Sequence, residues 1–154
     1  MIKYLTVILI SMVPLIELRG AVPIAIGQGI DPLLALAICT VSNMVPVPII
    51  YFFARKFLLW GSRQKHIGKF CSFFVEKGEK AGQKLVKKTG RGGLFLALLL
   101  FVGIPVPGTG AWTGTLAASF LNMGFKSTVA SVSLGVLLAG IIMGTASVAV
   151  LGIF

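Results

Sequence analysis

The sequence predicts an all-α integral membrane protein, built as an inverted repeat of a re-entrant helical hairpin followed by a transmembrane helix. Of its 154 residues, 56% are hydrophobic and only 12% are charged, so its apolar runs exceed what a small soluble core could enclose. Two of these runs are interrupted in corresponding positions, at 17–23 and at 103–114, and a long unbroken apolar segment follows each interruption. A broken helix followed by a whole one, twice, is typical of transporters whose site lies where the breaks meet.

The lengths of the apolar segments indicate which of them cross the membrane. Because a helix rises about 1.5 Å per residue, about 20 residues are needed to cross about 30 Å of hydrocarbon. Two segments are long enough, 33–54 and 127–154. Four shorter segments are predicted to be half-helices, paired in two hairpins: 4–16 with 21–30, and 94–104 with 111–123. Backbone unwound within lipid must be covered by protein or line a cavity, so each hairpin should pack against the long helices.

We therefore predict a single membrane domain at 1–154, with repeat one at 1–54, a basic connector at 55–93 and repeat two at 94–154. The net charge is +10, and 11 of the 14 basic residues lie in the connector. A basic segment between membrane segments is typical of a cytoplasmic loop beside anionic lipid, so no nucleic-acid partner is expected. Within the connector, apolar residues recur at spacings that fit an amphipathic helix in the headgroup region.

The positive-inside rule places the connector in the cytoplasm, in the inner (cytoplasmic) membrane, with both termini outside. Lys126 then lies on the cytoplasmic side as well. In an alternative topology each broken pair crosses as one kinked helix, which gives four spans and cytoplasmic termini. The four-span alternative places Lys3 on the cytoplasmic side, where the positive-inside rule favours it. The double-hairpin topology places Lys126 there instead.

Two charged residues, Glu17 and Arg19, lie near the tip of the first hairpin. A charged side chain within a membrane segment costs about 2.5 to 3.5 kcal/mol on insertion scales, so both are functional candidates. Glu17 is the candidate for proton coupling. The alternative is that the two residues form one structural ion pair that staples the hairpin.

The second interruption contains the residues that stop a helix and start it again. Pro105 and Pro107 lack the amide hydrogen that a continuing helix needs, and Gly108 and Gly110 permit a tight backbone. Thr109 is the expected N-cap of the restarted half-helix.

Three more residues complete the predicted site. Thr113 would present a second hydroxyl one turn beyond Thr109, and Trp112 would form a wall. In the first hairpin, Pro23 suits the first turn of the returning half-helix. The predicted substrate-binding set is thus Glu17, Arg19, Pro23, Gly108, Thr109, Gly110, Trp112 and Thr113.

The electrostatics of this arrangement favour an anion. Two half-helix N-termini, each with unpaired N–H groups and about half a positive charge, point toward the membrane middle, and Arg19 adds a full charge. Asn43, near Pro46 and Pro48, is assigned a structural role. In the last segment, glycines at 135, 140 and 144 form a small-residue face for internal packing or for a homodimer. No catalytic, nucleotide-binding or metal-binding motif is found, so we expect no enzyme, no cofactor, no metal and transport driven by an ion gradient.

The motifs ELRGAVP at 17–23 and PVPGTGAWTG at 105–114 resemble the small multi-drug export protein family, and the likeness covers nearly the whole chain. That family in turn resembles the DedA and VTT superfamily. The resemblance implies a double-hairpin fold and membrane transport, and the DedA side implies flipping of a polyprenyl-phosphate carrier lipid with the proton-motive force. Glu17 matches the acidic residue of the first hairpin. The sequence departs from the DedA pattern at 103–114, which carries no charge where DedA proteins carry arginines.

These observations predict a small secondary transporter or lipid translocase, ion-gradient coupled through a proton, whose amphipathic anionic substrate resembles a lipid phosphate. Its expected partners are membrane lipid, that substrate and a second copy of the chain. Two alternatives stay open: an exporter of lipophilic drugs, and a non-transporting membrane scaffold or scramblase.

Overall fold

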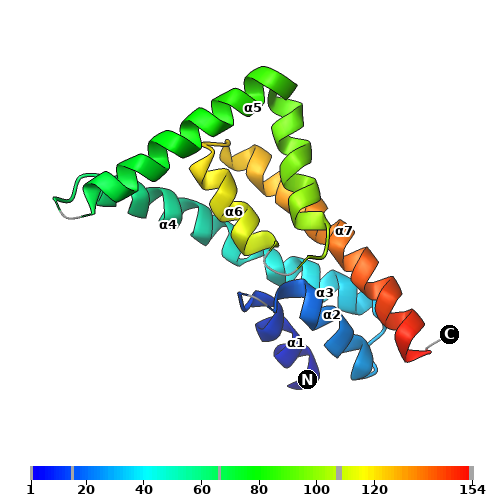
Figure 1. Cartoon of the computed structure of the whole chain (residues 1–154). Coiled ribbons are helices and arrows are strands. Elements are labelled where there is room, and N and C mark those ends of the chain that lie inside the picture. The colour runs from blue at the N-terminus through cyan, green and yellow to red at the C-terminus, as the bar shows by residue number, and fades with distance from the viewer. Residues whose placement is uncertain (1, 15, 66, 107–108, 153–154) are drawn as a thin grey trace.

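A computed structural model describes residues 2–14, 16–65, 67–106 and 109–152 (Figure 1). Every regular element in these residues is a helix. The helices are, in chain order, α1 (Ile2–Met12), α2 (Glu17–Gly27), α3 (Pro32–Met44), α4 (Pro46–Gly61), α5 (Gly68–Gly103), α6 (Ala111–Phe120) and α7 (Phe125–Leu151). The order of two short helices followed by a long apolar stretch is seen once at α1–α4 and again from the end of α5 to α7.

The long apolar segment of the first repeat is divided into α3 and α4. Asp31 begins α3, because its carboxylate accepts hydrogen bonds from the amides of Leu33 at 3.0 Å and Leu34 at 3.2 Å. The division falls at Val45, just before the two prolines whose nitrogens cannot donate to the preceding turn. Val45 itself keeps helical dihedral angles (φ −58°, ψ −46°), so one apolar helical stretch runs from Pro32 to Ser62.

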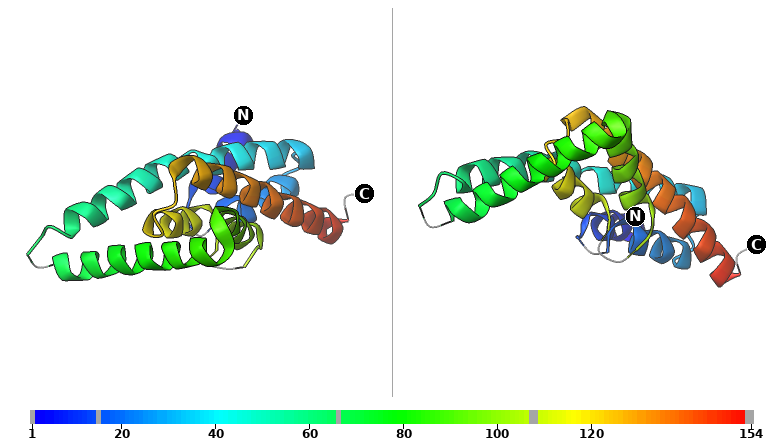
Figure 2. Two further views of the ribbon diagram at one scale, coloured as in Figure 1. Left: turned by 90° about the horizontal axis from the view of Figure 1, so that it is seen from above. Right: turned by 45° about the horizontal axis from the view of Figure 1, so that its top comes forward.

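Most of the basic connector lies in α5, while its first residues belong to α4, which ends at Gly61. Helix α5 bends at Gly90, whose φ of +73° lies in the left-handed region that favours glycine. The part of α5 before the bend carries six of the eleven basic residues of the connector. With the end of α4, it extends away from the other helices (Figure 2). The part after the bend is the apolar half-helix that was predicted at 94–104.

The centre of the fold is α7, which packs against α2, α3 and the second half of α5. Buried side chains of α2, among them Leu18 and Val22, lie in one core with Val132 and Val136 of α7. Buried hydroxyls also tie the helices together. Ser11 donates to the Cys39 carbonyl at 2.8 Å. Such bonds satisfy the hydroxyl and hold neighbouring helices in register.

The small-residue face of α7 is used inside the chain. A Cβ added at Gly135 would lie 2.8 Å from the Leu99 carbonyl oxygen and from Val102, and one at Gly140 would overlap the side chain of Leu36. Gly135 and Gly140 thus serve internal packing, and the homodimer role of this face stays a prediction.

Replacing Gly135 by alanine should therefore destabilise the protein by about 1 to 3 kcal/mol, since α5 backbone cannot move aside as a flexible side chain can. Gly144 is the matched control on the same helix, because the nearest atom to its added Cβ is 3.9 Å away. Gly144→Ala should be neutral or stabilising by up to about 1 kcal/mol. Thermal unfolding of both variants in detergent measures the difference, and equal stability would contradict this packing.

Candidate functional site

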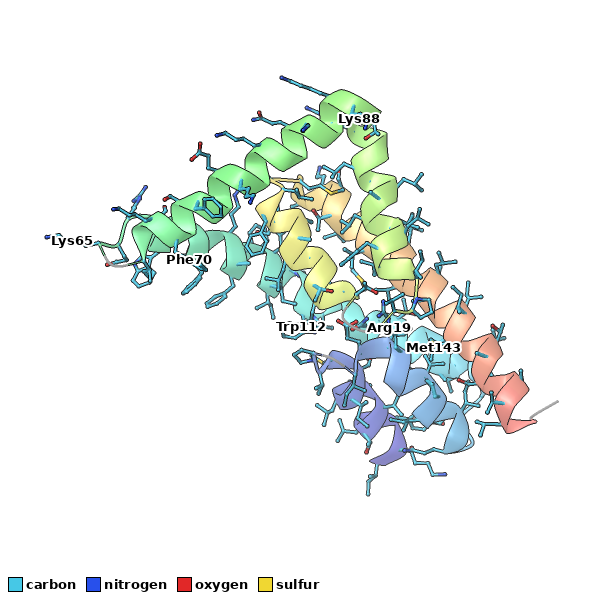
Figure 3. All side chains as sticks on the ribbon, viewed as in Figure 1. Arg19, Lys65, Phe70, Lys88, Trp112 and Met143 are labelled. Atoms are coloured by element: carbon cyan, nitrogen blue, oxygen red, sulfur yellow. The ribbon has the colours of Figure 1, made fainter. Side chains whose placement is uncertain are left out.

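The N-terminal end of α2 meets the segment that joins α5 to α6. Arg19 of α2 and Trp112 of α6 lie near each other at this junction (Figure 3). The two interruptions of the sequence are thus brought together, although more than 80 residues separate them in the chain. The junction forms from the start of one helix, the end of a second and the start of a third.

Arg19 binds the end of α5. Its guanidinium Nη2 donates to the carbonyl oxygens of Val102 and Ile104, both at 3.1 Å, and to the Thr109 hydroxyl at 2.8 Å. Its Nη1 donates to the Val106 carbonyl. The last carbonyls of a helix lack intrahelical donors and carry the negative end of its dipole, so a guanidinium both satisfies and neutralises them.

Glu17 binds the start of α6. It is buried, with 6% of its surface exposed, and its carboxylate accepts a hydrogen bond from the Trp112 amide at 3.0 Å. Gly110, the N-cap residue of α6, offers no side-chain cap, and a Cβ there would overlap Glu17 Oε2. The carboxylate therefore occupies the capping position of α6 from another helix, at the positive end of the α6 dipole.

The two charged residues thus engage opposite ends of two different helices. Within the described residues they form no ion pair with each other, in contrast to the single staple considered as an alternative from the sequence. Glu17 also has a φ of +50°, which is uncommon for a residue other than glycine. Strained backbone of this kind is concentrated at functional sites.

Three predictions for the hairpin tips are wrong. The interruption predicted at 17–23 is helical, because α1 ends at Met12 and α2 begins at Glu17. Pro23 lies inside α2, and α2 begins at Glu17, so Pro23 is beyond the first turn. The N-cap of α6 is Gly110 instead of Thr109. The Thr109 hydroxyl does not cap α6. It accepts from Arg19 and lies within hydrogen-bond distance of the Ile104 and Val106 carbonyls, at 3.1 and 2.9 Å. Gly110 leaves the capping position open to Glu17.

The other predicted residues contribute unequally. Trp112 supplies its backbone amide, while its indole Nε1 is buried and has no hydrogen-bond partner among the described residues. Thr113 is exposed, and its hydroxyl lies 3.4 Å from the Gly110 carbonyl of its own helix, so it is not brought to Glu17 and Arg19. Gly108 lies outside the described residues.

Asn43 is a component that the sequence reasoning assigned to structure alone. It is 1% exposed, and its side-chain oxygen has no hydrogen-bond partner among the described residues. It lines a cavity of about 10 Å³ together with Glu17, Arg19 and Gly110. A cavity of this size holds at most one water molecule. The sequence signal was an amide at mid-depth of an apolar segment, but nothing local indicated which helix it would face.

The described residues contain no group of three or more histidine, cysteine, aspartate or glutamate side chains that could hold a metal ion. Two helical stretches, 32–62 and 125–151, are long and apolar enough to cross a membrane. These two stretches and the helical elements of the described residues agree with an all-helical membrane protein.

The chain belongs to the family described as putative small multi-drug export protein, whose model matches residues 17–142. The match begins at Glu17 and contains both interruptions, so the whole junction lies within it. Comparisons with curated proteins and with solved structures give no match. The family description is that of an exporter, which agrees with a membrane transporter.

Proposed function

We propose that this protein is a small secondary transporter or lipid translocase, in which an amphipathic anion such as a lipid phosphate binds between the two hairpin tips. One observation carries the proposal: the carboxylate of Glu17 lies at the uncapped N-terminus of α6, with Trp112 N–H donating to it at 3.0 Å. Helix N-termini bind phosphate and carboxylate groups through such amides. In the proposal, Glu17 occupies the position that the anionic group of the substrate takes.

Competition between Glu17 and the substrate gives the coupling. A protonated Glu17 has lost its charge, so it no longer opposes an anion at the α6 N-terminus. Proton uptake and substrate entry are therefore linked, and transport draws on a proton gradient. During this exchange Arg19 stays bound to the carbonyls at the end of α5 and so keeps the second hairpin attached to α2. It also supplies a positive charge to the tip of the second hairpin, which has no charged residue of its own.

The cycle also requires opening. The cavity at the junction is about 10 Å³, which excludes any lipid phosphate, so the hairpins must part before substrate enters. A larger cavity of about 520 Å³ lies between the bend of α5 and the start of α7, and Lys87 and Arg91 line it. Two cations at a cavity favour an anionic ligand. We propose that this cavity opens on the cytoplasmic side of the inner membrane. In this topology both hairpins are re-entrant and form an inverted repeat, and both termini lie outside. Two copies of the chain form a dimer.

Replacing Glu17 by glutamine tests the proposal. In vesicles containing the purified protein, Glu17→Gln should abolish the dependence of lipid-phosphate movement on a proton gradient while the protein stays folded. The matched control is Glu76→Gln on α5. Glu76 is exposed, and its hydrogen bond at 2.5 Å to Lys80 lowers its pKa, so this carboxylate is already ionised and paired away from the junction. Proton-dependent movement that survives Glu17→Gln would refute the assigned role.

The family description favours a second candidate, export of lipophilic drugs. A groove of about 300 Å³ between α3 and α7, lined by apolar side chains such as Leu33, Leu36 and Ile141, would suit such compounds. A thermal-shift panel separates the candidates, since a ligand stabilises the state that binds it. Stabilisation by lipid phosphates that is lost in Arg19→Ala supports the anion. Stabilisation by lipophilic cations alone, which is lost when Glu17 is replaced and not when Arg19 is replaced, supports drug export. In the vesicle measurement, lipid movement that is independent of any ion gradient supports a scramblase.

A further inference from the structure

Asn43 presents a buried hydrogen-bond acceptor to the cavity that Glu17 lines. Its side-chain oxygen has no partner among the described residues, and the residue is only 1% exposed, a condition that costs about 1 to 3 kcal/mol for an unsatisfied polar group. An acceptor retained at that cost indicates a donor that is absent in this conformation.

The groups around the cavity restrict what that donor can be. On α2, Arg19 already donates to the end of α5 through both terminal nitrogens. On α6, the amide of Trp112 donates to Glu17 itself, and the carbonyl of Gly110 accepts from Gly114 within the helix. The α5 and α7 residues at the cavity are apolar. Arg19 is thus the one other charged group among the described residues that face the carboxyl.

A protonated carboxyl group differs from a carboxylate by having one O–H donor, which needs an acceptor. Among the described residues around this cavity, the acceptor left free is the side-chain oxygen of Asn43. We propose that Glu17 and Asn43 together form a buried proton-binding site, in which the Glu17 O–H donates to Asn43 Oδ1 directly or through the single water that the cavity holds. The proposal rests on the transport role of Glu17 and extends it to α3.

The chemistry is one protonation. A proton from bulk water adds to a carboxylate oxygen of Glu17 and forms an O–H bond, and only hydrogen bonds change besides. The ionised carboxylate is held by α6 and the protonated carboxyl by α3. Asn43 is therefore a positioning residue, which gives the protonated side chain a place away from the α6 N-terminus. Asn43 lies two residues before the interruption of the helix at Val45. The protonated carboxyl group is thus bound next to the junction of α3 and α4.

Infrared difference spectroscopy between high and low pH tests the site in purified protein without substrate. The carboxyl C=O band of Glu17 is identified by its loss in Glu17→Gln. Asn43→Leu keeps the side-chain volume but removes the acceptor, so the band should move to the higher frequency of a carboxyl without a hydrogen bond. The matched control is Thr40→Val on the same helix, whose hydroxyl is also buried without a partner but does not line the cavity. The control should leave the band in place.

A second measurement leaves Asn43 itself unchanged. The chain contains two asparagines, Asn43 and Asn122, so an Asn122→Ser protein labelled with ¹³C at the asparagine side chain reports Asn43 alone. Its amide C=O band should shift when Glu17 is protonated and stay fixed in Glu17→Gln. A Glu17 band unmoved by Asn43→Leu, or a labelled band that ignores pH, would overturn the proposal. Neither readout depends on flux, so failure here is distinct from failure of proton-dependent transport.

Discussion

Gly110→Ala is expected to abolish transport and to lower the free energy of unfolding by about 1 to 3 kcal/mol, the usual range for overpacking a buried position. The added Cβ would overlap Glu17 Oε2, so the carboxylate could not stay at the start of α6. The backbone of Gly110 is extended, with φ 166°, so alanine brings no dihedral strain of its own. The destabilisation would come from the lack of room for the Glu17 carboxylate, and the α6 N-terminus would lose its cap.

A matched glycine exists at the start of the next helix. Gly124 is the N-cap residue of α7, and no atom lies within 4 Å of a Cβ added there. Gly124→Ala should leave both transport and stability near those of the unmodified protein. Vesicle flux and thermal unfolding of the two variants give the comparison. Transport by Gly110→Ala at the unmodified rate would mean that the carboxylate is not needed at this position.

Arg19→Ala is expected to give the largest loss of stability, at least about 3 kcal/mol. Hydrogen bonds to a charged group contribute about 1.5 to 3 kcal/mol each when buried, and this side chain makes four, two of them partly buried and two exposed. Its removal leaves the carbonyls of Val102, Ile104 and Val106 without the donors that they have in the folded protein. We therefore expect the second hairpin to separate from α2, which limited proteolysis and unfolding in detergent would both detect.

Two further variants define the cause. Arg19→Lys keeps the charge but not the planar fork of donors, so it should recover only part of the stability. Arg91→Ala removes an exposed arginine of α5 and should change stability by less than about 0.5 kcal/mol. If Arg19→Ala were no less stable than Arg91→Ala, the hydrogen bonds at the end of α5 would not hold the hairpins together.

The sequence predicted the parts of the fold that depend on local chemistry. The short apolar segments, the stop at Pro105 and the restart after Gly110 follow from missing amide hydrogens and backbone freedom, and the helices end and begin there. Local chemistry was less informative about α2, which absorbs Pro23 and starts four residues before the predicted 21–30 segment. Tertiary contacts of Glu17 and Arg19 hold that first turn, and a pattern of residues does not show them.

The candidate site was predicted in its charges but not in its pairing. Glu17 and Arg19 were identifiable because a charge is costly in an apolar segment. Apart from the Thr109 hydroxyl, their partners are backbone groups of residues between Val102 and Trp112, and backbone groups leave no trace in a sequence. Asn43 was visible as a polar residue, but its role depends on which face of α3 meets α2. Whether the hairpins enter and leave on the same side of the membrane, and whether the chain forms a dimer, remain predictions.

The left-handed backbone of Glu17 is a strained conformation at the junction. A residue held at a φ of +50° stores free energy of about 1 kcal/mol or more, and the side chain of this same residue is attached to α6. If the carboxylate leaves α6 as proposed above, we expect the first turn of α2 to relax. A proton arriving at one side chain would thereby release tension in the main chain, and the motion would begin at the residue that received it.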